Sequence, residues 1–324
     1  MREELIPSTD LRPRGVGLGT ADLGVRQDEP SAHRLLDRFV ALGGNLLDTA
    51  RVYSDWIPGE SGRSERIIGD WIRQRGHHDD VIVSTKGGHP RLDRMDTLRL
   101  DEPSLCADVD LSLHALRVDA IDLFFLHRDA PDQPVEPFID VLNRLCDTGK
   151  IRWFGASNWT AARIAAANTY AAASGQRGFV ASQSLWNLGS GTMHRPPDPT
   201  LVVVDHAEAR ALRPLRIAHL PYSGQAGGYF SKLVESDDSG TPTATLNPLY
   251  DTPANRALAE PVRDLAQRHA CRVNAVVLAY LSHQASTVVP VVGCSRPEQL
   301  ESTWDDLNVP LSPAELATLQ VSTG

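Results

Sequence analysis

Residues 81–86 read Val-Ile-Val-Ser-Thr-Lys, and residues 121–127 read Ile-Asp-Leu-Phe-Phe-Leu-His. Each stretch is a short apolar run that ends in a polar side chain, and the amphipathic stretch Ser104–Leu116 lies between them. A buried strand, a helix and a second buried strand in this order predict a β-α-β unit with parallel strands. The same alternation continues toward both ends of the chain.

Eight strands and the helices between them are expected from this alternation. Parallel strands with intervening helices predict an α/β fold, a (β/α)8 TIM barrel, with residues 1–324 as a single domain. The stretch Ser231–Asn255 is rich in Ser, Asp, Thr and Pro, and is expected to be an irregular lid or pocket wall, or a disordered surface loop. The strands are expected near Gly15–Leu18, Asn45–Asp48, Val81–Lys86, Ile121–His127, Ile151–Ser157, Phe179–Gln183, Arg216–Tyr222 and Thr287–Val292, and helices at Ser31–Leu42, Gly62–Arg75, Ser104–Leu116, Pro134–Thr148 and Thr160–Ala173.

The composition is that of an ordinary globular protein, with 41% hydrophobic and 23% charged residues. A net charge of −9 argues against binding to nucleic acid or to an anionic membrane. We see no secretory signal and no apolar segment long enough to span a membrane. The four cysteines are far apart and lack CxxC spacing, which favours reduced thiols in a cytoplasmic protein. The sequence gives no signal for the number of subunits.

Four polar residues stand where expected strands end. Asp48 closes one apolar run, Tyr53 follows in the next loop, and Lys86 and His127 close the next two runs. Singly, each has an ordinary structural explanation, such as a helix cap, a solvated strand end or a core histidine. In a barrel, however, the carboxyl ends of the strands meet on one face, so these four side chains are expected to converge there.

Their combined chemistry suits reduction of a carbonyl group. A ketone or aldehyde that accepts hydride develops alkoxide character, and a nearby acid must donate a proton to it. Tyrosine is a weak acid, but a neighbouring ammonium group lowers its pKa. We therefore expect Tyr53 to be the proton donor, Lys86 to lower its pKa, Asp48 to hold Lys86 charged, and neutral His127 to polarise the carbonyl oxygen.

At these residues the sequence resembles the aldo-keto reductase family, and the resemblance covers nearly the whole chain. It implies a (β/α)8 barrel, reduction of a small-molecule carbonyl substrate with NADPH, and the four roles above. Residues 85–90 and 222–228 look closest to bacterial members. The matching pieces are Gly17-Leu18-Gly19-Thr20, Asp48-Thr49-Ala50 with Tyr53, Ser64-Glu65, Ile68-Gly69, Thr85-Lys86, Asp122-Leu123 with His127, Gly155-Ala156-Ser157-Asn158 and Gln183.

The reaction requires a hydride donor, and no side chain can supply one. The Gly-rich turn after the first strand lacks the last glycine of the dinucleotide fingerprint, which argues against a doubly wound fold. The resemblance instead places NADPH, with NADH as the less favoured choice, on scattered strand ends. Ser302 and Thr303 depart from the family pattern near the adenosine. The implied cofactor residues are Gly19, Thr20, Asp48, Ser157, Asn158, Gln183, Tyr222, Ser223, Gln225, Gly293, Ser295, Arg296 and Gln299.

Residues that rim the four reactive groups are expected to contact the substrate: Ala21, Trp56, His89 and Trp186. The sequence His77-His78-Asp79-Asp80 lacks metal-ligand spacing and is expected to be a solvated turn, so no metal site is predicted. Two other functions remain open. The chain could be a nicotinamide-binding regulatory subunit with little turnover, or a reductase of an activated C=C bond, although His127 favours carbonyl chemistry.

Overall fold

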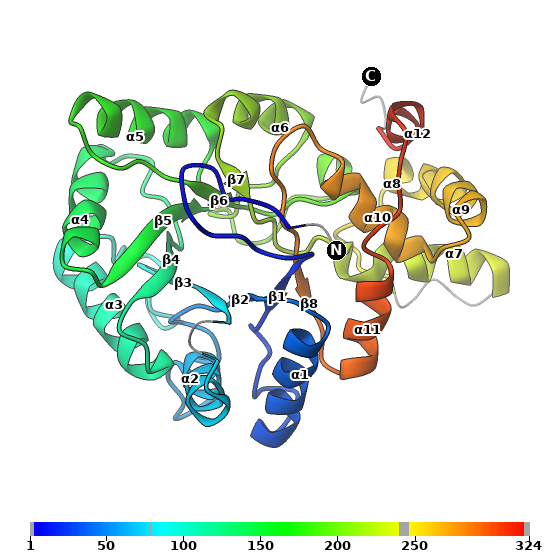
Figure 1. Ribbon diagram of the computed structural model, residues 1–324. Coiled ribbons are helices and arrows are strands. Elements are labelled where there is room, and N and C mark those ends of the chain that lie inside the picture. Colours follow the sequence, from blue (N-terminus) through cyan, green and yellow to red (C-terminus); the bar gives the residue numbers. More distant parts are fainter. Residues whose placement is uncertain (1–2, 78–79, 240–245, 321–324) are drawn as a thin grey trace.

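The computed structural model describes residues 3–77, 80–239 and 246–320. Eight parallel strands form one curled sheet in the order β7-β6-β5-β4-β3-β2-β1-β8 (Figure 1). The ring closes where His219 pairs with Val288, because the His219 amide donates to Thr287 and the Val289 amide donates to His219. The predicted barrel is confirmed. Its strands are β1 (Gly17–Gly19), β2 (Leu46–Asp48), β3 (Ile82–Gly87), β4 (Ile121–Leu126), β5 (Ile151–Ser157), β6 (Ala181–Gln183), β7 (Ala218–His219) and β8 (Val291–Gly293).

Helices surround the strands in Figure 1. Their first turns carry the expected signals: Asp28, Asp101 and Thr160 each accept a hydrogen bond from a backbone amide at the start of a helix. The described helices are α1 (Glu29–Ala41), α2 (Arg63–Arg75), α3 (Glu102–Leu116), α4 (Glu136–Asp147), α5 (Ala161–Ala173), α6 (His206–Leu212), α7 (Tyr229–Ser239), α8 (Pro253–Ala257), α9 (Ala259–Arg268), α10 (Val273–Ser282), α11 (Pro297–Asp305) and α12 (Pro313–Thr318), with short 3₁₀ turns at η1 (Ser190–Thr192), η2 (Arg213–Leu215) and η3 (Ala226–Gly228).

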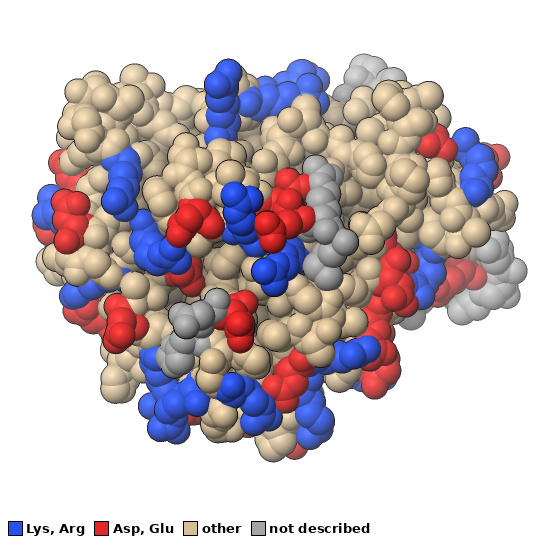
Figure 2. Space-filling model, viewed as in Figure 1, with Lys and Arg blue, Asp and Glu red and all other residues tan. Residues whose placement is uncertain are grey.

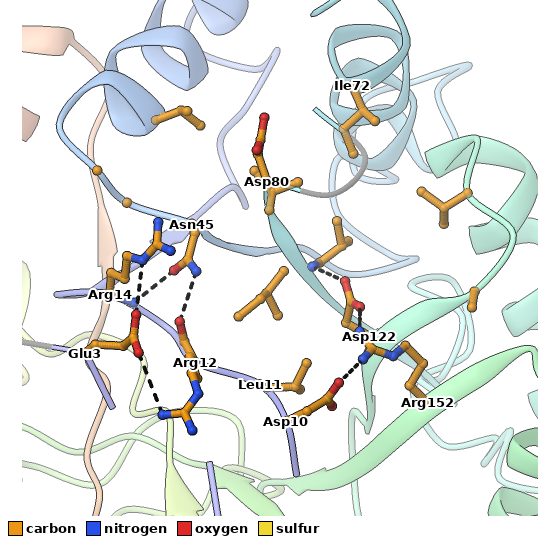
Figure 3. A pocket seen from close by; sticks show the side chains of 18 of the residues that line it. Glu3, Asp10, Leu11, Arg12, Arg14, Asn45, Ile72, Asp80, Asp122 and Arg152 are labelled. Carbon is orange, nitrogen blue, oxygen red and sulfur yellow. Dashed lines mark hydrogen bonds and ion pairs between the residues drawn. The ribbon is translucent and has the colours of Figure 1, made fainter. Parts of the chain in front are cut away.

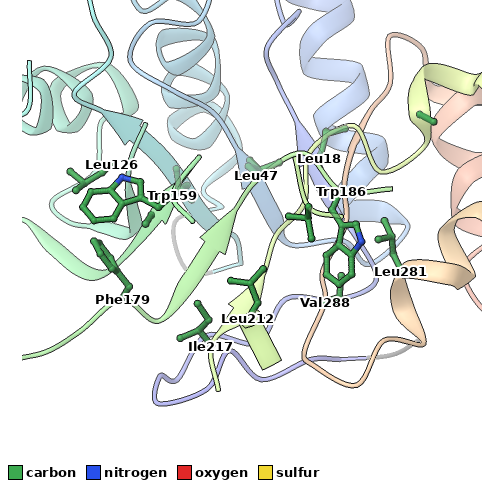
Figure 4. Packing of buried hydrophobic residues seen from close by; sticks show 14 of the residues in the cluster. Leu18, Leu47, Leu126, Trp159, Phe179, Trp186, Leu212, Ile217, Leu281 and Val288 are labelled. Atoms are coloured by element: carbon green, nitrogen blue, oxygen red, sulfur yellow. The ribbon is translucent and has the colours of Figure 1, made fainter. Parts of the chain in front are cut away.

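The buried core has an inner and an outer layer, which β4 illustrates. Leu123 and Phe125 belong to the cluster inside the barrel, whereas Phe124 and Leu126 belong to the cluster between strands and helices. Successive side chains of a strand point to opposite faces, so one apolar run fills both layers. Figure 4 shows part of the outer layer, including Trp159.

The amino ends of the strands are covered by the N-terminal segment, which crosses the barrel in Figure 1. Ile6 and Leu11 from this segment are buried in the inner cluster. A hollow of about 760 Å³ lies beside it, where Arg152 pairs with both Asp10 and Asp122 (Figure 3). Positive and negative side chains alternate over this face in Figure 2, so it carries no large patch of one sign. These contacts stabilise the amino-terminal end of the barrel. The polar residues at the strand ends lie at the opposite, carboxyl-terminal end.

One expectation about the elements is wrong. Residues 231–239 and 253–255 are not irregular, since they belong to helices α7 and α8. Helix α7 forms because Tyr229, Phe230, Leu233 and Val234 recur at helical spacing and are buried. Residues 240–245 of that segment, and His78 and Asp79 of the expected solvated turn, lie outside the described residues. None of the described helices has the length and apolar character needed to cross a membrane.

Candidate active site

Lys86 joins the other groups at the carboxyl ends of β2 and β3. Its ammonium Nζ donates to Asp48 Oδ2 at 2.8 Å, to the Thr49 carbonyl at 2.7 Å and to the Tyr53 hydroxyl at 3.1 Å. The ammonium group also lies 4.8 Å from the centre of the Tyr53 ring. Asp48 and Lys86 are almost completely buried. All three donor positions of the ammonium are therefore used, and its place relative to the phenol is fixed.

The second carboxylate oxygen of Asp48 is also held. Asp48 Oδ1 accepts hydrogen bonds from Ser84 Oγ at 2.5 Å and from Gln183 Nε2 at 2.9 Å. Ser84 is not among the site residues predicted from the sequence. It lies two residues before Lys86, however, and so on the same face of β3. That period of two is the signal that could have identified it.

Burial raises the pKa of the Tyr53 hydroxyl, although Lys86 acts in the opposite direction and lowers it. The expected effect of Lys86 is therefore present, but desolvation outweighs it. Burial also disfavours the charged form of Lys86, yet Asp48 and Tyr53 together raise the pKa of its ammonium group above the usual value. Lys86 is consequently charged and Tyr53 protonated at neutral pH, the state that a proton donor requires.

His127 follows β4, and its backbone amide donates to the Gly87 carbonyl at 2.8 Å. Its ring centre lies 6.0 Å from that of Tyr53 and 4.8 Å from that of His89, both with edge-to-face geometry. Burial lowers the pKa of His127 well below its usual value, and Lys86, Arg128 and His89 lower it further. The imidazole is therefore neutral at physiological pH and can donate one hydrogen bond to an oxygen.

A cavity of about 1440 Å³ runs from Asp48 and Tyr53 toward the start of α11. The loop 223–228 forms part of its wall, and several of its residues have the left-handed backbone, with φ values of 57° at Ser223, 61° at Gly227 and 75° at Gly228. Successive amides in such a turn can point toward one bound anion. Ten predicted site residues line this cavity: Gly19, Ala21, Asp48, Tyr53, Tyr222, Ser223, Gln225, Gly293, Ser295 and Gln299.

At the far end of the cavity, Ser295 precedes α11, whose first residue is Pro297. The Ser295 amide and hydroxyl both donate to Gln299 Oε1 at 3.0 Å. Arg296 is exposed next to it and is not among the residues that line the cavity. A helix N-terminus with an adjacent serine and arginine suits a phosphate group.

Four further predicted cofactor residues, Thr20, Ser157, Asn158 and Gln183, do not line the cavity either. Thr20 Oγ1 donates to the Asp48 carbonyl at 2.9 Å, so it supports Asp48. Asn158 donates to the His127 carbonyl and to Ser157 Oγ, and accepts a hydrogen bond from the Tyr222 hydroxyl at 2.8 Å. Gln183 Oε1 is buried and has no hydrogen-bond partner among the described residues.

The predicted substrate residues are spread over different environments. Ala21 lines the large cavity, and His89 lines a second opening of about 480 Å³ next to the Tyr53 loop. Trp56 is 47% exposed and lines neither opening. Trp186, expected to form an aromatic wall, lines neither opening in this structure, because its side chain is buried in the outer core and packs against His219 (Figure 4). A large apolar ring gains more from burial there than from exposure at a cavity rim.

The fold and the site place the chain in the class of barrel oxidoreductases, since an acid, a phenol, an amine and an imidazole meet at the carboxyl ends of its strands. A sequence model described as the Aldo/keto reductase family matches residues 15–322, and the chain belongs to this family. The protein is accordingly an oxidoreductase that acts on carbonyl groups.

Individual relatives agree with this assignment. The chain is 29% identical to norsolorinic acid reductase stcV of Emericella nidulans, over 98% of this chain and 80% of that protein. It is 25% identical to an aryl-alcohol dehydrogenase [NADP(+)] of Phanerodontia chrysosporium, over 98% of this chain and 84% of the relative. Both relatives are fungal, so they lend no support to the bacterial subgroup expected from residues 85–90 and 222–228.

Proposed function

We propose that the protein reduces an aldehyde or ketone to an alcohol with NADPH, and that Tyr53 donates the proton. The observation that carries this proposal is the Lys86 ammonium, which bridges the buried Asp48 carboxylate and the Tyr53 hydroxyl. Nothing in a purely structural ion pair requires a phenol as the third partner. We further propose that residues 1–324 form one domain and that the protein is cytoplasmic, which its four unpaired cysteines support.

A substrate oxygen positioned between Tyr53 and His127 would receive two hydrogen bonds. Neutral His127 donates one and so polarises the carbonyl. Tyr53 donates the other and transfers its proton as charge develops on the oxygen, while Lys86 stabilises the phenolate that remains. Asp48 keeps Lys86 charged and directed at the phenol.

The residues around the cavity fit a nicotinamide dinucleotide. When bound, the nicotinamide would supply the hydride. Gln183 Oε1 is a buried acceptor without a partner among the described residues, and it could accept a hydrogen bond from the nicotinamide carboxamide. Tyr222 offers a ring for stacking, loop 223–228 offers amides to the diphosphate, and Ser295 and Arg296 suit a phosphate on the adenosine.

A fluorescence titration tests the choice of cofactor. NADPH is expected to bind more tightly than NADH, because only NADPH carries the additional phosphate. Arg296→Gln is expected to weaken NADPH binding by roughly tenfold, the effect of one charge-assisted hydrogen bond, and to leave NADH binding within about twofold. Equal weakening of both dinucleotides would show that Arg296 does not recognise this phosphate.

The substrate is proposed to be an aromatic or similarly bulky carbonyl compound. The names of norsolorinic acid reductase stcV and of the aryl-alcohol dehydrogenase support this. A panel of aromatic and aliphatic aldehydes, followed by NADPH oxidation, tests the proposal. Higher kcat/KM for the aliphatic members would contradict it.

His127 is expected to make stability fall as the medium becomes acidic. Its pKa is lowered in the folded protein, so below pH 6.5 the unfolded chain binds a proton that the folded chain rejects. Between pH 7.0 and 5.5 this costs about 1 kcal/mol of the free energy of unfolding. Urea unfolding of the wild type and of His127→Gln at both pH values measures the difference. An identical loss in the two proteins would contradict a neutral, buried His127.

A further inference from the structure

Arg128 is a buried cation that the mechanism above does not use. It follows His127 directly in the sequence and is 9% exposed. Trp159 Nε1 donates to its backbone carbonyl at 3.0 Å, which fixes the main chain beside the site. The side chain therefore starts from the carboxyl end of β4, next to the residue proposed to polarise the substrate.

The guanidinium group of Arg128 is only partly satisfied. One terminal nitrogen donates to the His127 carbonyl at 3.0 Å, and the other donates to Asp198 Oδ2 at 3.2 Å. Its Nε is buried and has no hydrogen-bond partner in the part of the chain that the structure describes. A buried charge is costly unless its hydrogen bonds are filled, so an arginine held in this way has spare capacity for an anion.

Asp198 is a weakly held partner. It lies in the loop between η1 and α6, and its side chain is 31% exposed. Its other oxygen, Oδ1, accepts hydrogen bonds from the amide and hydroxyl of Thr200 at 2.9 and 2.6 Å. The Asp198 side chain would therefore keep its two hydrogen bonds from Thr200 if it left the guanidinium.

The positive charge of Arg128 acts on the reactive groups. Burial raises the pKa of Tyr53 and Tyr222, and the charge of Arg128 opposes that rise. Burial lowers the pKa of His127 and His89, and Arg128 lowers both further. These four groups come from loops after β2, β4, β7 and β3, so the charge lies close to the point where they meet. An anionic group on a bound substrate would experience the same attraction.

We propose that Arg128 is a specificity-determining residue, which selects carbonyl substrates that carry a carboxylate. The substrate carboxylate binds the guanidinium in place of Asp198, while the carbonyl oxygen lies between Tyr53 and His127. Planar two-point pairing with a carboxylate is what a guanidinium provides and an ammonium does not. This inference rests on the proposed carbonyl reduction.

Matched acids and methyl esters test it: phenylglyoxylate against methyl phenylglyoxylate, and 4-formylbenzoate against methyl 4-formylbenzoate. The ratio of kcat/KM for acid over ester is measured in each pair. At least one pair is expected to favour the acid in the wild type. Arg128→Met is expected to lower that ratio by about 10- to 100-fold, the effect of a lost charge-assisted hydrogen bond. Arg128→Lys should lie between the two, and Asp198→Asn should raise the ratio.

If Arg128 had a purely structural role, Arg128→Met would change kcat/KM for the acid and for the ester by the same factor. An unchanged ratio in Arg128→Met, or esters preferred by the wild type in both pairs, would overturn the proposal. If Arg128→Met fails to fold, Arg128→Lys and Asp198→Asn decide, and an unchanged ratio in both overturns it. Failure of the proposed function looks different: then no acid and no ester is reduced by any variant.

Discussion

Tyr53→Phe is expected to lower kcat for carbonyl reduction by about 10²- to 10⁴-fold, the usual contribution of a positioned general acid. The variant keeps the ring and loses only the hydroxyl, which lies 3.1 Å from the Lys86 ammonium. Lys86 retains its bonds to Asp48 and to the Thr49 carbonyl, so the fold should be preserved. Steady-state oxidation of NADPH with an aromatic aldehyde measures the loss, and the dissociation constant for NADPH should change little.

Tyr170→Phe is the matched control for this substitution. Its hydroxyl donates to Asp140 at 3.0 Å and joins α5 to α4, away from the cavity. The control also loses one phenolic hydroxyl, but kcat should remain within about twofold of the wild type. If Tyr53→Phe retained a similar kcat, Tyr53 would not be the proton donor.

Lys86→Met should have the largest effect on stability. Removing the ammonium leaves the Asp48 carboxylate buried beside a thioether, and breaking a buried ion pair in this way costs about 3–5 kcal/mol. Catalysis should be lost as well, because the phenolate of Tyr53 would have no cation beside it. Urea unfolding followed by circular dichroism measures the stability, and NADPH oxidation measures the activity.

Lys150→Met provides the control for the loss of a lysine ion pair. Lys150 pairs with Asp110 at 2.5 Å on the surface, so its loss should cost less than about 1 kcal/mol. Adding Asp48→Asn to Lys86→Met removes the unpaired charge and should restore more than half of the lost stability, without restoring activity. An unfolding midpoint of Lys86→Met equal to that of the wild type would rule out the buried pair.

The sequence predicted the barrel because the strands that carry the reactive groups, β2, β3 and β4, begin as apolar runs and end at or next to a polar side chain. Asp48, Lys86 and His127 stand at those ends, so their convergence follows from parallel strands around one axis. The position of Tyr53 was predictable for a related reason, since Tyr53 follows the last residue of β2 closely in the chain and so lies over the same end of the barrel.

Other features depend on contacts between distant residues. From its place in the sequence, Trp186 was expected to line the cavity. Its side chain instead belongs to the outer core, together with Leu281 and Val288. The pKa of Tyr53 depends on how completely the site is buried, which the sequence does not specify. The burial of Arg128 and its single hydrogen bond to Asp198, 70 positions along the chain, likewise appear only in three dimensions.

The most direct measurement of the central claim follows a labelled hydride into cinnamaldehyde, which offers both a C=O and a C=C bond. The protein is incubated with NADPH carrying deuterium at the transferable C4 position, and the products are analysed by mass spectrometry and NMR. We expect cinnamyl alcohol with deuterium on the carbinol carbon, formed at least about 100-fold more slowly by Tyr53→Phe. Deuterated 3-phenylpropanal, or tight NADPH binding without any labelled product from cinnamaldehyde or the other aldehydes, would contradict the account.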